Sequence, residues 1–223
     1  MSSDPRDRRT RHAALLTSGE DRHLLVDTPP ELRLQLLDAG VSSVDAVWYT
    51  HDHADHTHGI DDLRVFSSRR GHVPAFAGPE TVASLRRKFS YIFDADYRPP
   101  DGTTKPEVEL TEIADDVAIE VAGFHLVPLR VPHGDTDSYG FRMDDLAYVT
   151  DGKSLPPSVL EKMRGVRVLV LNALWFGNPH PTHFNIEEAI AAAELVGAER
   201  TFLTHLTHRV RHSDLLERLP RGV

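Results

Sequence analysis

The sequence predicts an α/β layered fold with a largely antiparallel sheet. Short runs rich in β-branched and aromatic residues recur along the whole chain, and turn residues bound them, as is typical of strands. Amphipathic segments typical of helices lie between these runs. Several of the strand-like runs follow one another closely enough to form hairpins, which favours antiparallel pairing.

The predicted strands cover residues 12–16, 23–26, 46–49, 73–77, 117–121, 124–129, 139–143, 146–149, 166–171 and 201–203. The predicted helices cover residues 30–38, 81–89, 157–163, 186–196 and 213–218. The clearest helix is 186–196, because Asn185 suits its N-cap and Gly197 suits its end. Ser213 is the expected cap of the last helix.

Composition limits the classes of function. A chain of 223 residues is expected to form one domain, residues 1–223, and the Pro- and Gly-rich stretch 94–110 is expected to join two halves of it. The net charge of −9 argues against nucleic acid as a partner. The absence of cysteine excludes disulfides, thiolate metal sites and cysteine nucleophiles. No apolar run suggests a signal peptide or a membrane span, so a cytoplasmic protein without a membrane partner is expected.

The strongest chemical signal is the stretch "THDHADHTHGIDD", which follows the predicted strand 46–49. His51 and His53 are two residues apart, so on an extended segment their side chains point to the same side. Asp55 and His56 follow at once, and a helical turn is expected after them. One loop can therefore present three imidazoles and a carboxylate to a small volume.

Three further predicted strands end in the same way. His133 follows "LRVP", Asp151 follows "LAYVT" and His205 follows "TFLT". If these strands share one fold, their ends converge on one rim, and the seven groups are too many for a single tetrahedral ion. They suit two divalent ions that share a carboxylate, for which Asp151 is the candidate. The expected ligand sets are His51, His53 and His133 for one ion, and Asp55, His56 and His205 for the other.

The segment "HDHADH" matches the HxHxDH signature of the metallo-β-lactamase superfamily, and the later ligand candidates follow in the order of that family. The stretches "THDHADHTHGIDDLR", "PHPTHFNIEEA" and "LTHLTH" resemble the PhnP-type cyclic phosphodiesterases. The resemblance implies an αββα sandwich with a dinuclear zinc or manganese site at one edge. It also implies hydrolysis of a small phosphorylated substrate, a five-membered cyclic phosphate such as phosphoribosyl 1,2-cyclic phosphate.

The resemblance also suggests roles for individual residues. His183, in "PTHFNIEE", matches the histidine that protonates the departing ribose oxygen, and Asp55 and Asp151 complete the expected catalytic set. Asp27 matches an acid that orients a ligand histidine. Each has a structural alternative: His183 adjoins a helix cap, and Asp27 and Asp151 could be ordinary turn residues.

The sequence departs from this family at its start. The family begins with a strand, a Gly-rich turn and a cysteine cluster, and this chain shows none of them, so the sandwich is expected to lack its first strand. Either the lineage lost that segment or the start codon lies further upstream. His208 matches the partner of those cysteines in a second zinc site, which is not expected here.

Other functions stay open at this point. The same ions could polarise the carbonyl of a thioester, a lactone or another carbonyl substrate. The protein could also be a catalytically impaired metal-binding remnant. The sequence does not identify the natural substrate, the metal or the oligomeric state, and a homodimer is compatible with it.

Overall fold

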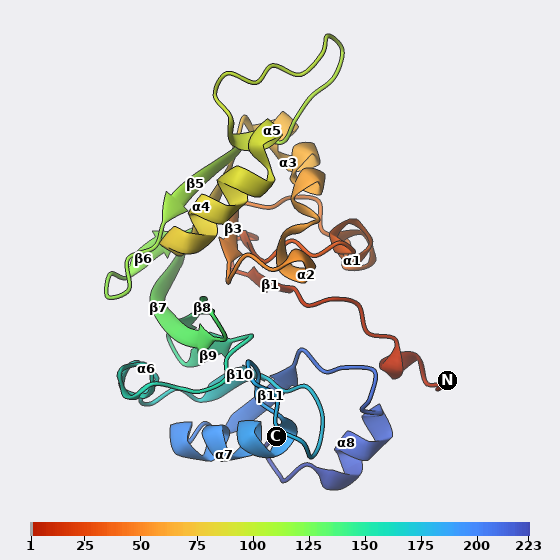
Figure 1. Ribbon diagram of the computed structural model, residues 1–223, viewed down its shortest axis with the longest axis vertical. Coiled ribbons are helices and arrows are strands. Elements are labelled where there is room, and N and C mark those ends of the chain that lie inside the picture. Colours follow the sequence, from red (N-terminus) through yellow and green to blue (C-terminus); the bar gives the residue numbers. More distant parts are fainter. Residues whose placement is uncertain (1) are drawn as a thin grey trace. The chain divides into compact units, whose positions relative to one another are not determined.

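The computed structural model describes residues 2–223 and divides into two compact units. The first unit is Arg11–Phe124, and the second unit combines Met1–Thr10 with His125–Val223. Each unit mixes helices with strands (Figure 1). Each unit also has its own apolar core. The predicted α/β class, built on two sheets, is confirmed.

The sheet of the first unit has the order β1-β2-β3-β4-β5. Its strands are β1 (Ala14–Thr17), β2 (His23–Val26), β3 (Ala46–Tyr49), β4 (Val73–Ala77) and β5 (Val108–Glu112). Only β1 and β2 pair antiparallel, while β2, β3, β4 and β5 are parallel neighbours. The prediction of a largely antiparallel sheet is wrong here. Every residue of β2 and β3 is buried, as is typical of parallel strands that are covered on both faces.

Helices make the crossovers between these parallel strands. They are α1 (Leu32–Asp38), α2 (Ala54–Thr57), α3 (Arg64–Arg70), α4 (Pro79–Lys88) and α5 (Ser90–Phe93), with the 3₁₀ turn η2 (Ile60–Leu63) before α3. The sequence did not predict α3, α5 or β5. The Pro- and Gly-rich stretch runs from α5 to β5 inside the first unit, so the expectation that it joins two halves of the chain is wrong.

The sheet of the second unit combines an antiparallel and a parallel part. Its strands are β7 (Phe124–His133), β8 (Thr136–Met143), β9 (Leu146–Val149), β10 (Val168–Asn172) and β11 (Arg200–Thr204), in the order β11-β10-β9-β8-β7, and the short β6 (Ile119–Val121) precedes them in the chain. The hairpins β7–β8 and β8–β9 are antiparallel, whereas β9, β10 and β11 are parallel. The C-terminal ends of β7, β9, β10 and β11 therefore lie at the same edge of this sheet.

Three helices accompany this sheet: α6 (Pro157–Lys162), α7 (Ile186–Val196) and α8 (His212–Arg218). The predicted start of α7 is confirmed, because the Asn185 side chain accepts from Glu188 N at 2.7 Å and Asn185 N donates to Glu188 at 2.9 Å. The predicted cap of α8 is wrong. Arg211 is its N-cap, and Ser213 lies inside the helix.

The N-terminal segment is fastened to the segment that follows β11. It contains the 3₁₀ turn η1 (Pro5–Asp7). Arg9 donates to the carbonyl oxygens of Thr207 and Val210 at 3.0 and 2.6 Å. Asp7 accepts from His212 N at 2.7 Å. These hydrogen bonds hold the segment around His208 in place. The sequence predicts no zinc site at His208.

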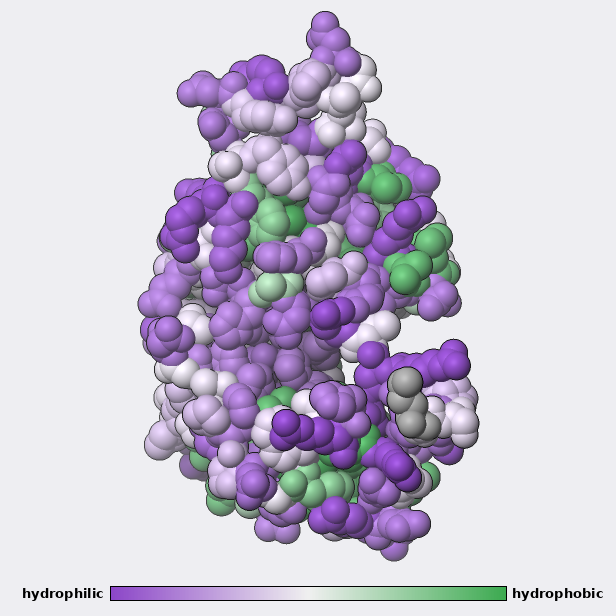
Figure 2. All heavy atoms as spheres, turned by 45° about the vertical axis from the view of Figure 1, so that its right-hand side comes forward, coloured by the Kyte–Doolittle hydropathy of each residue, from purple (hydrophilic) through white to green (hydrophobic). Residues whose placement is uncertain are grey.

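On the face drawn in Figure 2, hydrophilic side chains dominate and hydrophobic ones form small, separated patches. Exposed apolar side chains, such as Leu34 and Leu37 on α1, are ordinary in folded proteins. Among residues 2–223, no helix combines the length and the apolar character that crossing a bilayer requires.

Candidate metal centre

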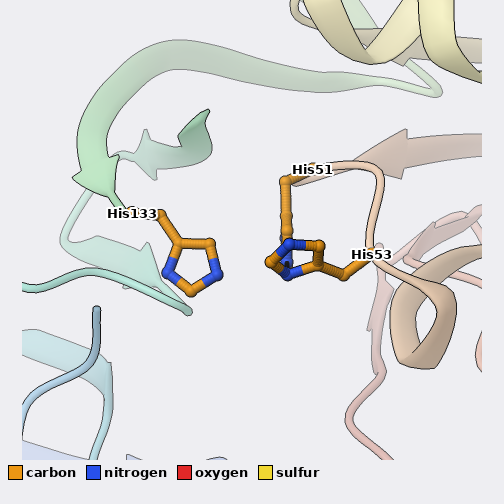
Figure 3. Close-up of side chains that lie close together, drawn as sticks. All are labelled: His51, His53 and His133. Atoms are coloured by element: carbon orange, nitrogen blue, oxygen red, sulfur yellow. Dashed lines mark hydrogen bonds between the residues drawn. The ribbon is translucent and has the colours of Figure 1, made fainter. Parts of the chain in front are cut away.

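The first unit carries one group of predicted ligands directly after β3. His51 Nε2 lies 3.0 Å from His53 Nδ1, and the two rings are close together and nearly perpendicular, at 79° (Figure 3). The short helix α2 begins immediately after His53 and brings Asp55 and His56 together, with 3.6 Å between Asp55 Oδ2 and His56 Nε2. One loop and one helical turn therefore gather all four predicted donors of this unit.

Asp27 lies beneath this group, at the end of β2. Because β2 and β3 are parallel neighbours, Asp27 adjoins Thr50 and accepts from its backbone N–H and its hydroxyl, both at 2.8 Å. Its Oδ2 also lies 2.7 Å from His56 Nδ1. Asp27 is fully buried, and this burial raises the pKa of its carboxyl while the adjacent His56 opposes the rise.

These hydrogen bonds fix which ring nitrogen can bind a metal. A carboxylate only accepts, so His56 Nδ1 carries the proton and Nε2 carries the lone pair. The hydroxyl of Thr50 donates to Asp27, so it accepts from His51 Nδ1 at 3.1 Å. His51 Nε2 is then the ligand nitrogen as well, in the manner of metal-binding histidines that an outer carboxylate orients.

The second group of predicted ligands surrounds Asp151 in the second unit. Its Oδ2 atom lies 3.0 Å from His183 Nε2, 3.3 Å from His205 Nε2 and 3.9 Å from His133 Nε2. His133, which is labelled in Figure 3, is the last residue of β7. Asp151 and His205 follow β9 and β11. His183 comes from the connection between β10 and α7. The shared edge of the sheet brings these groups together.

The donor chemistry of this group fits a divalent cation. The carbonyl oxygen of Thr182 lies 3.0 Å from His133 Nδ1 and can only accept, so His133 Nε2 carries the lone pair. That lone pair faces a buried carboxylate oxygen, an arrangement that a proton or a cation between them would stabilise. His133, Asp151 and His183 each offer a ligand atom, all within 4.8 Å of one another. Nitrogen and oxygen donors of this kind suit zinc and manganese alike.

The backbone is strained where the ligand candidates leave their strands. Three of them have a positive φ, namely Asp27 at 64°, Asp151 at 54° and His205 at 58°. This is the left-handed region, which residues other than glycine seldom adopt. Such residues cost on the order of 1–3 kcal/mol each and tend to occur at functional sites, where surrounding bonds hold them. Thr150 Oγ1, for example, donates to Asp151 Oδ1 at 2.5 Å.

Sequence reasoning missed Asn172, the last residue of β10. Its Oδ1 accepts from Gly152 N at 2.8 Å and so holds the peptide that follows Asp151. The residue is fully buried, and its Nδ2 has no hydrogen-bond partner among the described residues. The signal was available, because a polar residue ends the apolar run "VLVLN" as His133, Asp151 and His205 end theirs.

His180 extends the second group on one side. Its ring lies 5.0 Å from that of His183 and 5.5 Å from that of Trp175, measured between centroids. Burial lowers the pKa of His180, and charge on His183 lowers it further. A neutral His180 can accept at Nδ1 from the backbone N–H of Thr182, 3.3 Å away.

Comparisons with known proteins relate the whole arrangement to one family. The model of the beta-lactamase superfamily domain matches residues 22–206. The crystal structure of a diphosphatase from the PhnP family is similar with a TM-score of 0.88 and 37% identity, over 99% of this chain and 82% of that one.

Two relatives differ in their functions. An octanoyltransferase from Porphyromonas gingivalis is 34% identical over 220 residues, which is 98% of this chain and 44% of the relative, so this chain spans less than half of that protein. A ribonuclease Z from Bradyrhizobium diazoefficiens is 26% identical over 227 residues, covering 86% of this chain and 72% of the relative.

Proposed function

The chain belongs to the beta-lactamase superfamily, and we propose that within it the protein is a metal-dependent phosphodiesterase that opens a small cyclic phosphate, of the phosphoribosyl 1,2-cyclic phosphate type. The observation that carries the proposal is the 37% identity to a PhnP-family diphosphatase over 99% of the chain. The two groups of nitrogen and oxygen donors supply the chemistry that such a reaction needs.

The proposed cofactors are two divalent ions, zinc or manganese. The proposed ligands are His51, His53 and His133 for one ion and Asp55, His56 and His205 for the other, with Asp151 shared. When bound, such ions lower the pKa of water and neutralise charge on phosphoryl oxygens. The chain's own contribution is to present the Nε2 atoms of His51, His56 and His133, whose Nδ1–H groups donate to Thr50, Asp27 and Thr182.

His183 is the proposed general acid. Its Nε2 lies 3.0 Å from Asp151, and its Nδ1 lies 2.9 Å from the hydroxyl of Thr182, so both nitrogens are held in place. The side chain retains 13% exposure, which leaves it accessible to a substrate. A protonated imidazole can give its proton to the departing sugar oxygen as the phosphorus–oxygen bond breaks.

A small substrate is favoured over RNA, because a net charge of −9 opposes binding of a polyanion. A second candidate function is hydrolysis of a thioester. It is suggested by the octanoyltransferase relative, which is 34% identical over 98% of this chain. In that reaction the same groups would act on a carbonyl carbon in place of phosphorus.

Turnover of a substrate panel tests these functions. Bis(p-nitrophenyl) phosphate, ribose 1,2-cyclic phosphate, an octanoyl thioester and a β-lactam are offered to the protein before and after metal removal with a chelator. We expect phosphodiester turnover that disappears with the metal and returns when zinc or manganese is added. Turnover of the thioester alone would transfer support to the second candidate. If two metals are bound and nothing is turned over, the protein is a metal-binding remnant.

The variant Asp151→Asn links that activity to the site. We expect it to lower metal occupancy and phosphodiester turnover together. The matched control is Asp144→Asn, because Asp144 also has a left-handed backbone, with φ 48°, but is exposed in the turn between β8 and β9. If Asp151→Asn is as active as the control, Asp151 is not the shared ligand.

A further inference from the structure

The residue between two of the proposed ligands has contacts of its own. His51 and His53 leave the same loop (Figure 3), and Asp52 separates them in the chain. The Oδ2 atom of Asp52 accepts from Ser84 Oγ at 2.5 Å and from Lys88 Nζ at 2.6 Å. Both partners belong to α4, 32 and 36 residues further along the chain. The loop that carries the first group of donors is therefore joined to α4.

Lys88 also holds the backbone of this loop. Besides the carboxylate, its Nζ donates to the backbone carbonyl oxygen of Asp52 at 2.6 Å. That oxygen belongs to the peptide that joins Asp52 to His53. An ammonium group has three N–H donors, so one lysine can hold the side chain and the peptide of the same residue at once.

The peptide on the other side of His53 is held by α2. The carbonyl oxygen of His53 accepts from Thr57 Oγ1 at 2.9 Å and from His56 N at 3.1 Å. His53 itself is exposed, so packing contributes little to its position. The direction in which its side chain leaves the backbone is therefore set by its two peptides, and Lys88 holds the one that α2 does not.

The cluster formed by Asp52, Ser84 and Lys88 is partly shielded from water. Ser84 is 5% exposed, and the side chains of Asp52 and Lys88 are 23% and 34% exposed. Ser84 Oγ accepts from Arg87 at 3.2 Å, which leaves its own proton for Asp52. A partly exposed ion pair adds little to the stability of a fold, whereas hydrogen bonds at fixed positions define where a backbone lies. The arrangement of this cluster therefore favours a role in position over a role in stability.

We propose that Asp52 and Lys88 are positioning residues of the metal centre, and that they set the direction of the His53 side chain through the peptide between Asp52 and His53. The inference rests on the proposed metal-dependent function and adds α4 to the parts of the chain that shape its site. Residues that hold a ligand without touching the metal commonly change metal affinity as strongly as they change activity. Asp27 acts on His56 through its ring, and Lys88 acts on His53 through its backbone.

Charge and position predict opposite results for Lys88→Met. By charge alone, removal of a cation beside His51 and His53 strengthens the binding of a divalent ion. Loss of the bonds that hold Asp52 weakens that binding. We expect cobalt(II) to bind Lys88→Met roughly 10-fold more weakly than the wild type, as is usual when a residue that orients a ligand is lost. Binding as tight as that of the wild type, or tighter, overturns the proposal.

Two variants of Asp52 make the same distinction from the other side. An amide oxygen accepts hydrogen bonds as a carboxylate oxygen does, so Asp52→Asn can keep the bonds from Ser84 and Lys88 and loses only the charge. Asp52→Ala loses the bonds as well. We expect Asp52→Asn to bind cobalt(II) nearly as tightly as the wild type and Asp52→Ala to bind it roughly 10-fold more weakly. Equal weakening in both variants would show that charge is the cause, and the proposal would fail.

Lys105→Met is the matched control. Lys105 belongs to the same unit and has the same two kinds of partner, the carbonyl oxygen of Ile92 at 2.7 Å and the carboxylate of Glu107 at 3.3 Å, but these lie outside the loop 51–56. We expect wild-type affinity and a wild-type visible spectrum of bound cobalt(II), whereas the spectrum of Lys88→Met should change because it reports ligand geometry. Thermal unfolding of the metal-free forms identifies any variant that fails to fold, and the Asp52 pair then decides.

Cobalt binding also separates this inference from the proposed function, because it needs no turnover. If no phosphodiester is turned over and Lys88→Met still weakens cobalt(II) binding, the positioning role holds and only the proposed reaction fails. If phosphodiesters are turned over but Lys88→Met binds cobalt(II) as Lys105→Met does, only this inference fails. If the wild-type protein binds no cobalt(II), the inference is wrong together with the proposed metal centre.

Discussion

The substitution Asp27→Asn would separate the role of a carboxylate from that of a turn residue. Asparagine has nearly the same size and tolerates the left-handed backbone that Asp27 adopts, with φ 64°. What changes is Oδ2, which accepts from Thr50 Oγ1 at 2.8 Å and from His56 Nδ1 at 2.7 Å. An amide NH₂ at that position is a donor that faces two donors.

The magnitude follows from these two bonds. A hydrogen bond to a charged group contributes about 1.5–3 kcal/mol, and the easier burial of a neutral amide offsets part of that loss, so we expect a net destabilisation of about 2–4 kcal/mol. For a chain of this length that corresponds to a fall in Tm of roughly 5–15 °C. To relieve the clash of donors, His56 would move its proton to Nε2, which removes a ligand nitrogen. Metal affinity should then fall by roughly 10- to 100-fold.

Two assays check these values. Thermal unfolding of the metal-free protein measures the structural part, and competition with a chromophoric chelator measures zinc or manganese affinity. The control is Asp21→Asn, because Asp21 has a similar φ of 57° and its side chain is 89% exposed. We expect that control to match the wild type. If Asp27→Asn binds metal as tightly as the control does, Asp27 does not set the tautomer of His56 and the reasoning fails.

Three further variants test other parts of the structure. His183→Ala should keep its metal but lose roughly 10²- to 10⁴-fold in kcat, as expected for a general acid, and loss of metal in mass spectrometry would make His183 structural instead. Asn172→Ala leaves the buried N–H of Gly152 without its acceptor, so we expect the free energy of unfolding to fall by about 1–3 kcal/mol and metal binding to weaken. An unchanged metal affinity would show that Asn172 contributes to stability and not to the metal site. Arg9→Gln removes a guanidinium that donates to two carbonyl oxygens, so Tm should fall by several degrees, and an unchanged Tm would show that the N-terminal segment does not stabilise the fold.

The sequence by itself identified many of the elements. The strands 23–26, 46–49, 73–77 and 146–149 and the helix 186–196 were predicted with the bounds that the structure has. Apolar runs with clear turn or cap residues at both ends carry this information locally. The strand β5 was missed because its residues, "VELTE", alternate between half-buried and exposed positions and do not form an apolar run.

The sequence also identified the candidate metal ligands, because the HxHxDH spacing and the polar residues at strand ends can be recognised in the chain alone. Their assignment as ligands stays a prediction until metal is measured. The direction of strand pairing in the first sheet was predicted wrongly. Continuous buried runs such as β2 and β3, with helices between the strands, are typical of parallel pairing, whereas the prediction relied on closely spaced runs that suggested hairpins.

Only the tertiary structure decided which atom of each side chain is available. The proton position on the ligand histidines depends on their hydrogen-bond acceptors. Two of these acceptors are distant in sequence, Asp27 for His56 and Thr182 for His133. The support of Gly152 by Asn172 and the bond from Lys88 to Asp52 likewise join segments that are remote in the chain. Hydrogen bonds and ring contacts act over a few ångströms of space, so spacing along the sequence can nominate their members but cannot determine their partners.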